Sequence, residues 1–259
     1  MGPGSYVYDQ QWQEERRRLA GMEALWDPGT KAVIESLGIA SGWHCLEIGA
    51  GGGSIAEWLA ERVGPEGAVL ATDVSTRYLD ALDAPNLEVR EHDILRDPLP
   101  EGAYDLVHAR LVVEHLGRPA LERMVPPLRP GGWLVLEDYS FASFRVYPEH
   151  ELLDRTTEAV TGFMAKAGFD PEYGRKLVPE LEDVGLEQVD ADARARVYRG
   201  GEPGSAFIRL SLESLRPALV EAGALSDDEI EAALAMVDDP ANVFVSPLMV
   251  AGWGSRPGA

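Results

Sequence analysis

The sequence has little cysteine and little lysine, with one Cys and three Lys among 259 residues. A single cysteine, Cys45, excludes an internal disulfide and is typical of a reducing compartment. Cys45 lies in an apolar run, which favours a buried thiol over a nucleophile. No apolar run reaches the roughly 18 residues that a transmembrane helix needs. The sequence therefore predicts a cytoplasmic protein that contacts no membrane.

Basic residues are also scarce, since 23 Lys and Arg stand against 44 Asp and Glu, for a formal net charge of -21. An acidic surface repels the phosphate backbone of nucleic acids and anionic membranes. No group of Cys and His residues has the spacing of a metal site. We therefore expect no nucleic-acid partner and no metal, but a small-molecule substrate bound by a monomer or homodimer.

The most informative segment is 46–54, in which a short apolar run with one acid enters a turn of glycines. Gly49, Gly51 and Gly53 allow a sharp turn and the close approach of a ligand. The helix predicted to begin at Ser54 offers unpaired N–H groups to a carboxylate or phosphate. The dinucleotide fingerprint G-x-G-x-x-G requires a glycine where Ser54 stands. Ser54 and the absence of a Tyr-x-x-x-Lys pair count against the nearest rival, a nicotinamide oxidoreductase.

Predicted strands alternate with predicted helices in the first half of the chain. This alternation indicates βαβ units and a parallel sheet, whose ligands lie beyond the carboxyl ends of the strands. Acids stand at these ends, namely Asp73, Asp93 and the pair Glu137 and Asp138, so we expect them to converge with the glycine turn. The strands are predicted at 43–48, 68–72, 87–90, 104–109 and 133–137, and the helices at 54–63, 75–82 and 119–125.

The remaining segments depart from this alternation, and we predict one domain, 6–259, with a lid and a helical cap. Residues 1–5 are interpreted as an expression-tag remnant. An aromatic-rich helix over 6–26, whose apolar stripe Glu15 interrupts, forms the predicted lid with the residues up to 29. Further helices are predicted at 30–37, 149–167, 174–184, 205–222 and from a capping box at Ser226, and strands at 186–198 and 243–253. The cap insertions are accordingly placed at 140–175 and 200–240.

The spacing Glu-x-Gly-x-Gly-x-Gly over 47–53, followed by Asp73 and Asp93, resembles the class I S-adenosylmethionine (SAM)-dependent methyltransferases. The resemblance covers roughly 30–253 and is most specific over 43–138. It implies a Rossmann-like α/β fold with a seven-stranded, mostly parallel sheet, an antiparallel last strand and helices on both faces. It also implies SAM as cofactor and S-adenosylhomocysteine as product.

The resemblance assigns the motif residues to parts of SAM. The glycine turn packs against the methionine part, Asp73 accepts both ribose hydroxyls, and Asp93 with Ile94 recognises the adenine. A carboxylate can accept two hydroxyl hydrogens at once, so the assignment is chemically sound. Arg110, which follows the fourth strand, is expected to contact the cofactor carboxylate or a substrate anion. The predicted cofactor-binding residues are Glu47, Gly49, Gly51, Gly53, Asp73, Val74, Asp93, Ile94 and Arg110.

Three side chains are candidates for the chemistry. Methyl transfer needs an aligned nucleophile and a dry site, and a hydroxyl or amine acceptor can also need a base. His115 leads, because 113–116 resembles a family segment beside the methionine end of SAM and because a histidine pKa near 6.5 suits proton removal. His108 and Tyr139 are the other two candidates, and simple packing is the alternative role for all three.

The sequence thus predicts a methyltransferase that moves a methyl group from SAM to an O, N or C atom of a small molecule in secondary metabolism. The Asn/Asp-Pro-Pro-Tyr motif of DNA-amine methyltransferases is absent, which favours a small acceptor. The alternative is a SAM-binding cyclase or regulator that performs no methyl transfer.

Overall fold

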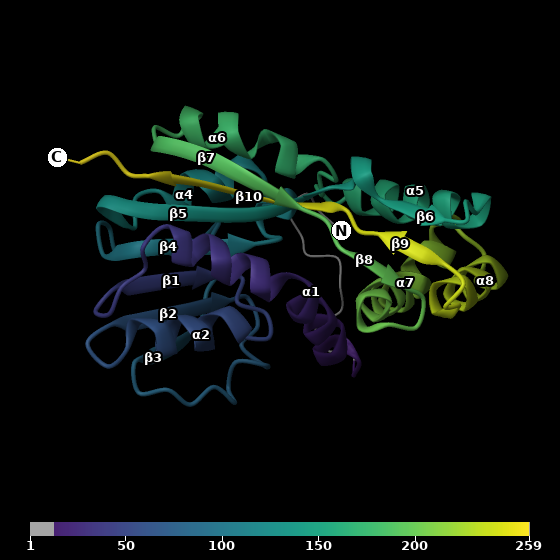
Figure 1. Cartoon of the computed structure of the whole chain (residues 1–259), viewed down its shortest axis with the longest axis horizontal. Coiled ribbons are helices and arrows are strands. Elements are labelled where there is room, and N and C mark those ends of the chain that lie inside the picture. The colour runs from purple at the N-terminus through teal and green to yellow at the C-terminus, as the bar shows by residue number, and fades with distance from the viewer. Residues whose placement is uncertain (1–12, 259) are drawn as a thin grey trace.

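A computed structural model describes residues 13–258, and a seven-stranded sheet of order β3-β2-β1-β4-β5-β10-β7 lies at its centre (Figure 1). Neighbouring strands from β3 to β5 are parallel, whereas β10 runs antiparallel to both β5 and β7. The predicted Rossmann-like sheet of seven mostly parallel strands is therefore confirmed. The strands are β1 (His44–Ile48), β2 (Ala68–Asp73), β3 (Leu87–Glu91), β4 (Tyr104–Arg110), β5 (Leu128–Ser140), β7 (Glu187–Arg194) and β10 (Leu248–Ser255).

Helices cover both faces of this sheet, each over its own apolar core. On one face, Ile34 and Leu59 pack with the buried Cys45 of β1. On the other face, Leu121 and Leu181 pack against the opposite side of the same strands. Strands covered on both faces must be apolar on both sides, which explains their nearly continuous apolar runs. The first face carries α1 (Glu15–Ser36) and α2 (Ser54–Val63), and the second carries α3 (Val113–Leu116), α4 (Arg118–Met124), η2 (Tyr173–Lys176) and α6 (Leu177–Asp183).

A cap with a separate apolar core lies at one end of the main sheet, drawn on the right of Figure 1. Its small sheet has the order β6-β9-β8. Its last helix begins at the predicted capping box, since Ser226 Oγ accepts from the Glu229 N–H at 3.3 Å and the Glu229 carboxylate accepts from the Ser226 N–H at 2.7 Å. The elements of the cap are η1 (Phe141–Ser143), β6 (Arg145–Tyr147), α5 (Glu151–Ala165), β8 (Val197–Arg199), α7 (Pro203–Glu221), α8 (Asp227–Asp238) and β9 (Val243–Val245).

The prediction of one continuous strand at 186–198 and another at 243–253 is wrong. Each breaks in the middle, with one part in the main sheet and the other in the cap sheet. The breaks lie side by side, because the Ser246 N–H donates to the Arg196 carbonyl at 2.9 Å and the Arg196 N–H donates to Ser246 Oγ at 2.9 Å. Pro247 follows at once and has no N–H for a strand ladder.

The helix predicted at 75–82 is also wrong, since this segment forms turns. The Leu79 N–H donates to the Thr76 carbonyl at 2.8 Å, and the Leu82 N–H donates to the Leu79 carbonyl at 3.0 Å. Both leucines reach the glycine turn, where they pack against Gly53. The tertiary contact of these two side chains replaces the regular helix that the local pattern favours.

The helices predicted at 6–26 and 30–37 form one continuous helix, α1, within the described residues. Residues 6–12 of the predicted lid lie outside the described part of the chain. Three short elements, α3, η1 and β6, were not predicted, and they have only 4, 3 and 3 residues. The division into lid and cap insertions stays a prediction.

Candidate active site

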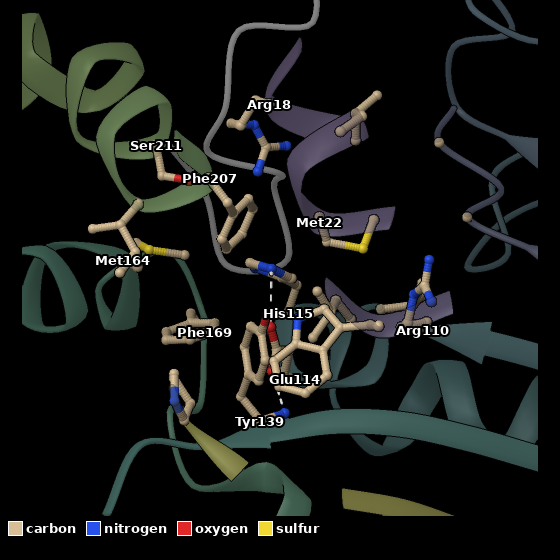
Figure 2. Close-up of a pocket in the computed structure, with 18 of the residues that line it drawn as sticks. Arg18, Met22, Arg110, Glu114, His115, Tyr139, Met164, Phe169, Phe207 and Ser211 are labelled. Carbon is tan, nitrogen blue, oxygen red and sulfur yellow. Dashed lines mark hydrogen bonds and ion pairs between the residues drawn. The ribbon is translucent and has the colours of Figure 1, made fainter. Parts of the chain in front are cut away.

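A cavity of about 440 Å³ lies between α1, the carboxyl ends of the parallel strands and the cap (Figure 2). Its wall includes Gly49 and Asp73 at one end and Phe244 in the cap at the other. Binding cavities for small molecules commonly measure roughly 300–1,000 Å³. The predicted convergence of strand ends thus produces a cavity of the size that a small ligand needs.

The glycine turn after β1 forms the floor of one end of the cavity. Gly49 has a φ of +70°, and a Cβ there would lie 2.5 Å from Val112 Cγ2, so only glycine is accommodated. The Gly51 N–H donates to Asp73 Oδ2 at 2.9 Å, which ties the turn to the end of β2. Gly53 has a φ of +87° and packs against Leu79 and Leu82 instead of lining the cavity.

The acids at this end suit the polar edges of a nucleoside. Asp73 also accepts from the Ser75 N–H at 3.1 Å, and burial, its main perturbation, raises the pKa of its carboxyl. Val74 beside it is 51% exposed and presents an apolar surface to the cavity. Asp93 accepts from the Leu95 N–H at 2.9 Å and lies in the same wall as Asp73.

The residues at this end therefore fit the adenosine of SAM. The carboxylates of Asp73 and Asp93 can accept from hydroxyl and amine donors, and the apolar side chains of Val74 and Ile94 offer surfaces for a flat base. The ring of His92 lines the same wall, and both of its nitrogens are buried without a hydrogen-bond partner within the described residues. A ligand with polar edges would satisfy such groups.

A buried ionic network lies behind the cavity, inside the main sheet. His108 Nδ1 lies 2.7 Å from Glu47 Oε2, and His108 Nε2 lies 3.5 Å from Glu137 Oε2. Burial lowers the pKa of His108, but Glu47 and Glu137 outweigh it and raise the pKa to about 9. Burial raises the pKa of Glu137, but His108 and nearby arginines outweigh it and lower the pKa to about 2. His108 is therefore a cation held between two carboxylates.

The network continues to α1 and β7. Glu137 also accepts from Thr30 on α1 and from Arg194 on β7. Arg110 donates to Thr30 Oγ1 at 2.9 Å and to Asp27 Oδ1 at 2.9 Å. Arg110 thus lines the cavity while its guanidinium is bound to α1.

His115, Glu114 and Tyr139 form the middle of the cavity wall (Figure 2). His115 Nε2 lies 3.6 Å from Glu114 Oε1, and the Tyr139 N–H donates to Glu114 Oε2 at 2.9 Å. Burial, and after it the charge of Arg18, lowers the pKa of His115 to about 4. Burial and the nearby Asp138 raise the pKa of Glu114 well above its usual range. His115 is therefore neutral near pH 7, and its imidazole is a weaker base than the ordinary histidine pKa of 6.5 implies.

Tyr139 has a fixed hydroxyl. The Trp26 Nε1–H donates to the Tyr139 oxygen at 2.8 Å, and the two rings meet edge to face at 5.8 Å. Burial is the main reason that the pKa of Tyr139 lies well above its usual value. Tyr139 therefore keeps its proton at neutral pH.

The structure brings most of the predicted site residues into one wall. The predicted residues that line the cavity are Gly49, Gly51, Asp73, Val74, Asp93, Ile94, Arg110, His115 and Tyr139. Glu47, Gly53 and His108 are not among the described lining residues, and Glu47 and His108 bind each other instead. The ligand contacts and catalytic roles themselves stay predictions.

Sequence reasoning missed the ion pair that α1 contributes. Arg18 binds Glu15 through two bonds of 2.7 Å, and both residues are buried in the cavity wall. In the sequence, Glu15 only interrupts the apolar stripe of the predicted lid. The spacing of three residues on one helix is the signal that identifies such a pair.

In the described range 13–258, no three His, Cys, Asp or Glu side chains gather as a metal site. None of the helices within this range is long and apolar enough to cross a membrane.

Comparison with known proteins points to one family. A family model described as a methyltransferase domain matches residues 46–136. The chain is 34% identical over 141 residues to methyltransferase str2 of Strobilurus tenacellus, covering 53% of this chain and 50% of that protein. It is 30% identical over 192 residues to the ubiquinone/menaquinone biosynthesis C-methyltransferase UbiE of Pseudomonas putida (strain W619), covering 66% and 72%.

The fold is shared with solved methyltransferases. Phosphoethanolamine N-methyltransferase 2 of Haemonchus contortus, solved with S-adenosylhomocysteine, matches with a TM-score of 0.56 and 14% identity, over 90% of this chain and 53% of that one. The chain spans about half the length of the first curated relatives that it matches. Together with the glycine turn and the acids of the cavity, these similarities show that the chain belongs to the class I SAM-dependent methyltransferases.

Proposed function

We propose that this protein transfers a methyl group from SAM to a small-molecule acceptor. The observation that carries the proposal is the continuity of the cavity, which joins the nucleoside wall at Asp73 and Asp93 to the apolar cap past His115. When bound, SAM supplies a methyl group on a positively charged sulfur. The cavity provides one space in which a cofactor and an acceptor meet, as an in-line transfer requires. Secondary metabolism as the setting is part of the same proposal.

The residues between the two ends of the cavity can orient the acceptor and take a proton from it. His115 is neutral, so it can take a proton from an acceptor hydroxyl or amine, or orient that group. Glu114, 3.6 Å away, limits the orientations of the imidazole. The apolar surroundings, which include the Phe169 ring at 5.0 Å from the His115 ring, keep water away from the reacting atoms.

Calorimetry tests the cofactor. We expect SAM and S-adenosylhomocysteine to bind and NAD not to bind. In Asp73→Ala, SAM should bind at least about tenfold more weakly, because each hydrogen bond to a charged group contributes roughly 1.5–3 kcal/mol. Asp80→Ala is the matched control, since Asp80 is exposed on the neighbouring turn. Binding of NAD without binding of SAM, or an unchanged SAM affinity in folded Asp73→Ala, would contradict the assignment.

The alternative is a SAM-binding cyclase or regulator without methyl transfer. Incubation of candidate acceptors with methyl-labelled SAM, followed by mass spectrometry, separates the alternatives. Label in the product together with S-adenosylhomocysteine supports transfer. A product of unchanged mass with intact SAM supports the cyclase.

The N-terminal half of α1 is expected to close over the bound ligands. Glu15, Arg18, Leu19 and Trp26 of α1 line the cavity, so ligands that touch them should slow the opening of this helix. Hydrogen exchange over 15–26 should therefore be slower with S-adenosylhomocysteine than without it. The outer part of α8 serves as the control segment. Equal exchange over 15–26 in both states would argue against a lid.

A further inference from the structure

The wall of the cavity changes character between its two ends. Its charged lining residues come from α1, from α3 and from the main sheet and its loops, and they include Arg18, Asp73 and Glu114. Every lining residue that the structure places between 141 and 247 is uncharged. In a chain with a net charge of -21, the charged side chains of this segment thus all lie away from the cavity wall.

Helix α5 shows how this separation arises. Leu153, Val160 and Met164 recur at helical spacing and face the cavity. Asp154 and Glu158 lie on the exposed side of the same helix. The apolar wall is therefore a property of one helix face, and not of the composition of the segment.

The polar side chains of this face also offer few donors. Thr156 Oγ1 donates to the Leu152 carbonyl at 2.7 Å, and Thr157 Oγ1 donates to the Leu153 carbonyl at 2.9 Å. Thr161 Oγ1 donates to the Thr157 carbonyl at 2.8 Å. The hydroxyl hydrogens are thus used within the helix. An ionised group placed against this face of α5 would lose its water without gaining a partner there, which is strongly unfavourable. Ser211 Oγ on α7 is a lining hydroxyl that is buried without a partner among the described residues, and it can serve a neutral hydroxyl.

Aromatic rings surround the same space. Figure 2 shows Phe169 and Phe207 beside His115. Phe141 meets Phe169 edge to face at 6.0 Å, and Tyr198 stacks on Phe244 at 5.8 Å. Edge-to-face and stacked partners of this kind favour a flat ring as the bound molecule.

Tyr139 supplies a directed donor at the reacting end. The indole N–H of Trp26 can only donate, so it occupies the Tyr139 oxygen as acceptor. The hydrogen of Tyr139 then remains for another group, and no acceptor for it is found within residues 13–258. Trp26 is in this sense a positioning residue for the Tyr139 hydroxyl.

We propose that the acceptor is an uncharged, ring-bearing molecule of the phenol class, whose ring lies against the uncharged cap wall and whose oxygen accepts a hydrogen bond from Tyr139. This inference rests on the proposed function, in which methyl transfer takes place in the part of the cavity beside His115. Trp26 and the face of α5 then set acceptor specificity, whereas the nucleoside wall sets cofactor specificity.

Matched probes test the inference by calorimetry in the presence of S-adenosylhomocysteine. The neutral probes are 2-naphthol and 4-phenylphenol, and the anionic probes of the same shape are 2-naphthoate and 4-phenylbenzoate. We expect the neutral probes to bind at least about tenfold more tightly than the anions. Equal affinities, tighter binding of the anions, or no binding of either neutral probe would overturn the proposal.

Substitutions at Thr157 test the wall. Thr157→Val should leave 2-naphthol binding unchanged, because the hydroxyl is bonded within α5. Thr157→Asp should weaken 2-naphthol binding at least about tenfold, because it buries a charge. Equal binding by the two variants would overturn the assignment of the wall.

Substitutions at Tyr139 and Trp26 test the donor. Tyr139→Phe should weaken 2-naphthol but leave 2-methylnaphthalene unchanged, and Trp26→Phe should show the same pattern to a smaller extent. Equal losses for both probes would indicate a packing role and overturn the donor assignment. Binding of S-adenosylhomocysteine is measured in every variant. If the parent protein does not bind S-adenosylhomocysteine, the proposed function is contradicted. If it binds S-adenosylhomocysteine but binds the anionic probes as tightly as the neutral ones, only this inference is contradicted.

Discussion

Replacing His115 by asparagine is expected to lower turnover by roughly 10²–10⁴-fold, the usual loss when a general base is removed. Asparagine keeps the polarity and much of the volume of histidine but cannot accept a proton for transfer. Burial, and after it Arg18, lowers the pKa of His115 to about 4, so its base form predominates throughout the neutral range. The measurement is turnover of an acceptor with S-adenosylhomocysteine affinity determined alongside it.

The control for this variant is His44→Asn. His44 is exposed at the start of β1 and is not among the described residues that line the cavity. The control should keep parental turnover. If His115→Asn stays within a few-fold of the parent, alignment alone drives the transfer and His115 has a packing role. A loss of cofactor affinity that matches the loss of turnover would likewise argue against a base.

The pH profile distinguishes His115 from its acidic neighbours. Asp138 has its pKa raised to about 7, mainly by burial. A change in activity near pH 7 is therefore expected to come from the Glu114 and Asp138 pair, and not from His115. The same change should appear in the parent and in the control His44→Asn. An inflection near the ordinary histidine pKa that disappears in His115→Asn would contradict the low pKa of His115.

Replacing His108 by glutamine is expected to destabilise the fold by about 3–5 kcal/mol, because it leaves the buried Glu47 carboxylate without its counter-charge, while Glu137 keeps Arg194. Glu47, His108 and Glu137 are all buried inside the sheet, at 4%, 0% and 0% exposure. Urea unfolding measures the effect. His44→Gln, on an exposed site, should change the free energy of unfolding by at most about 0.5 kcal/mol.

The same network predicts the direction of a pH effect. His108 has a pKa of about 9 in the fold against an ordinary value of 6.5, so the folded state holds its proton more tightly than the unfolded state. Its contribution to stability is fully present below pH 6.5 and is lost as the pH rises toward 9. In His108→Gln this decline should be smaller. An equal decline in parent and variant would show that other groups cause it.

His108→Gln also separates a structural from a catalytic role. His108 lies behind the cavity and binds Glu47, so a folded variant at low temperature should keep most of its turnover. A loss as large as that of His115→Asn, in protein shown to be folded, would restore His108 as a catalytic candidate.

The sequence alone determined the features that depend on residues close together in the chain. The turn at 49–53 requires left-handed backbone at Gly49, Gly51 and Gly53, and the capping box at Ser226 requires two groups three residues apart. The alternation of elements determined the parallel sheet, and the sheet brought Asp73 and Asp93 to one edge. Each of these features arises from local backbone chemistry or from the periodic pattern of apolar residues that helices and strands require.

The tertiary structure alone decided the features that depend on distant partners. The breaks after Arg194 and at Ser246 form because two segments far apart in sequence cross together from one sheet to another, and an apolar pattern does not record which sheet a strand joins. Leu79 and Leu82 cover Gly53 from turns, and not from the helix that their spacing favours. Glu47 pairs with His108 because a charge inside a sheet needs a counter-charge, and only the folded chain determines which one lies within reach.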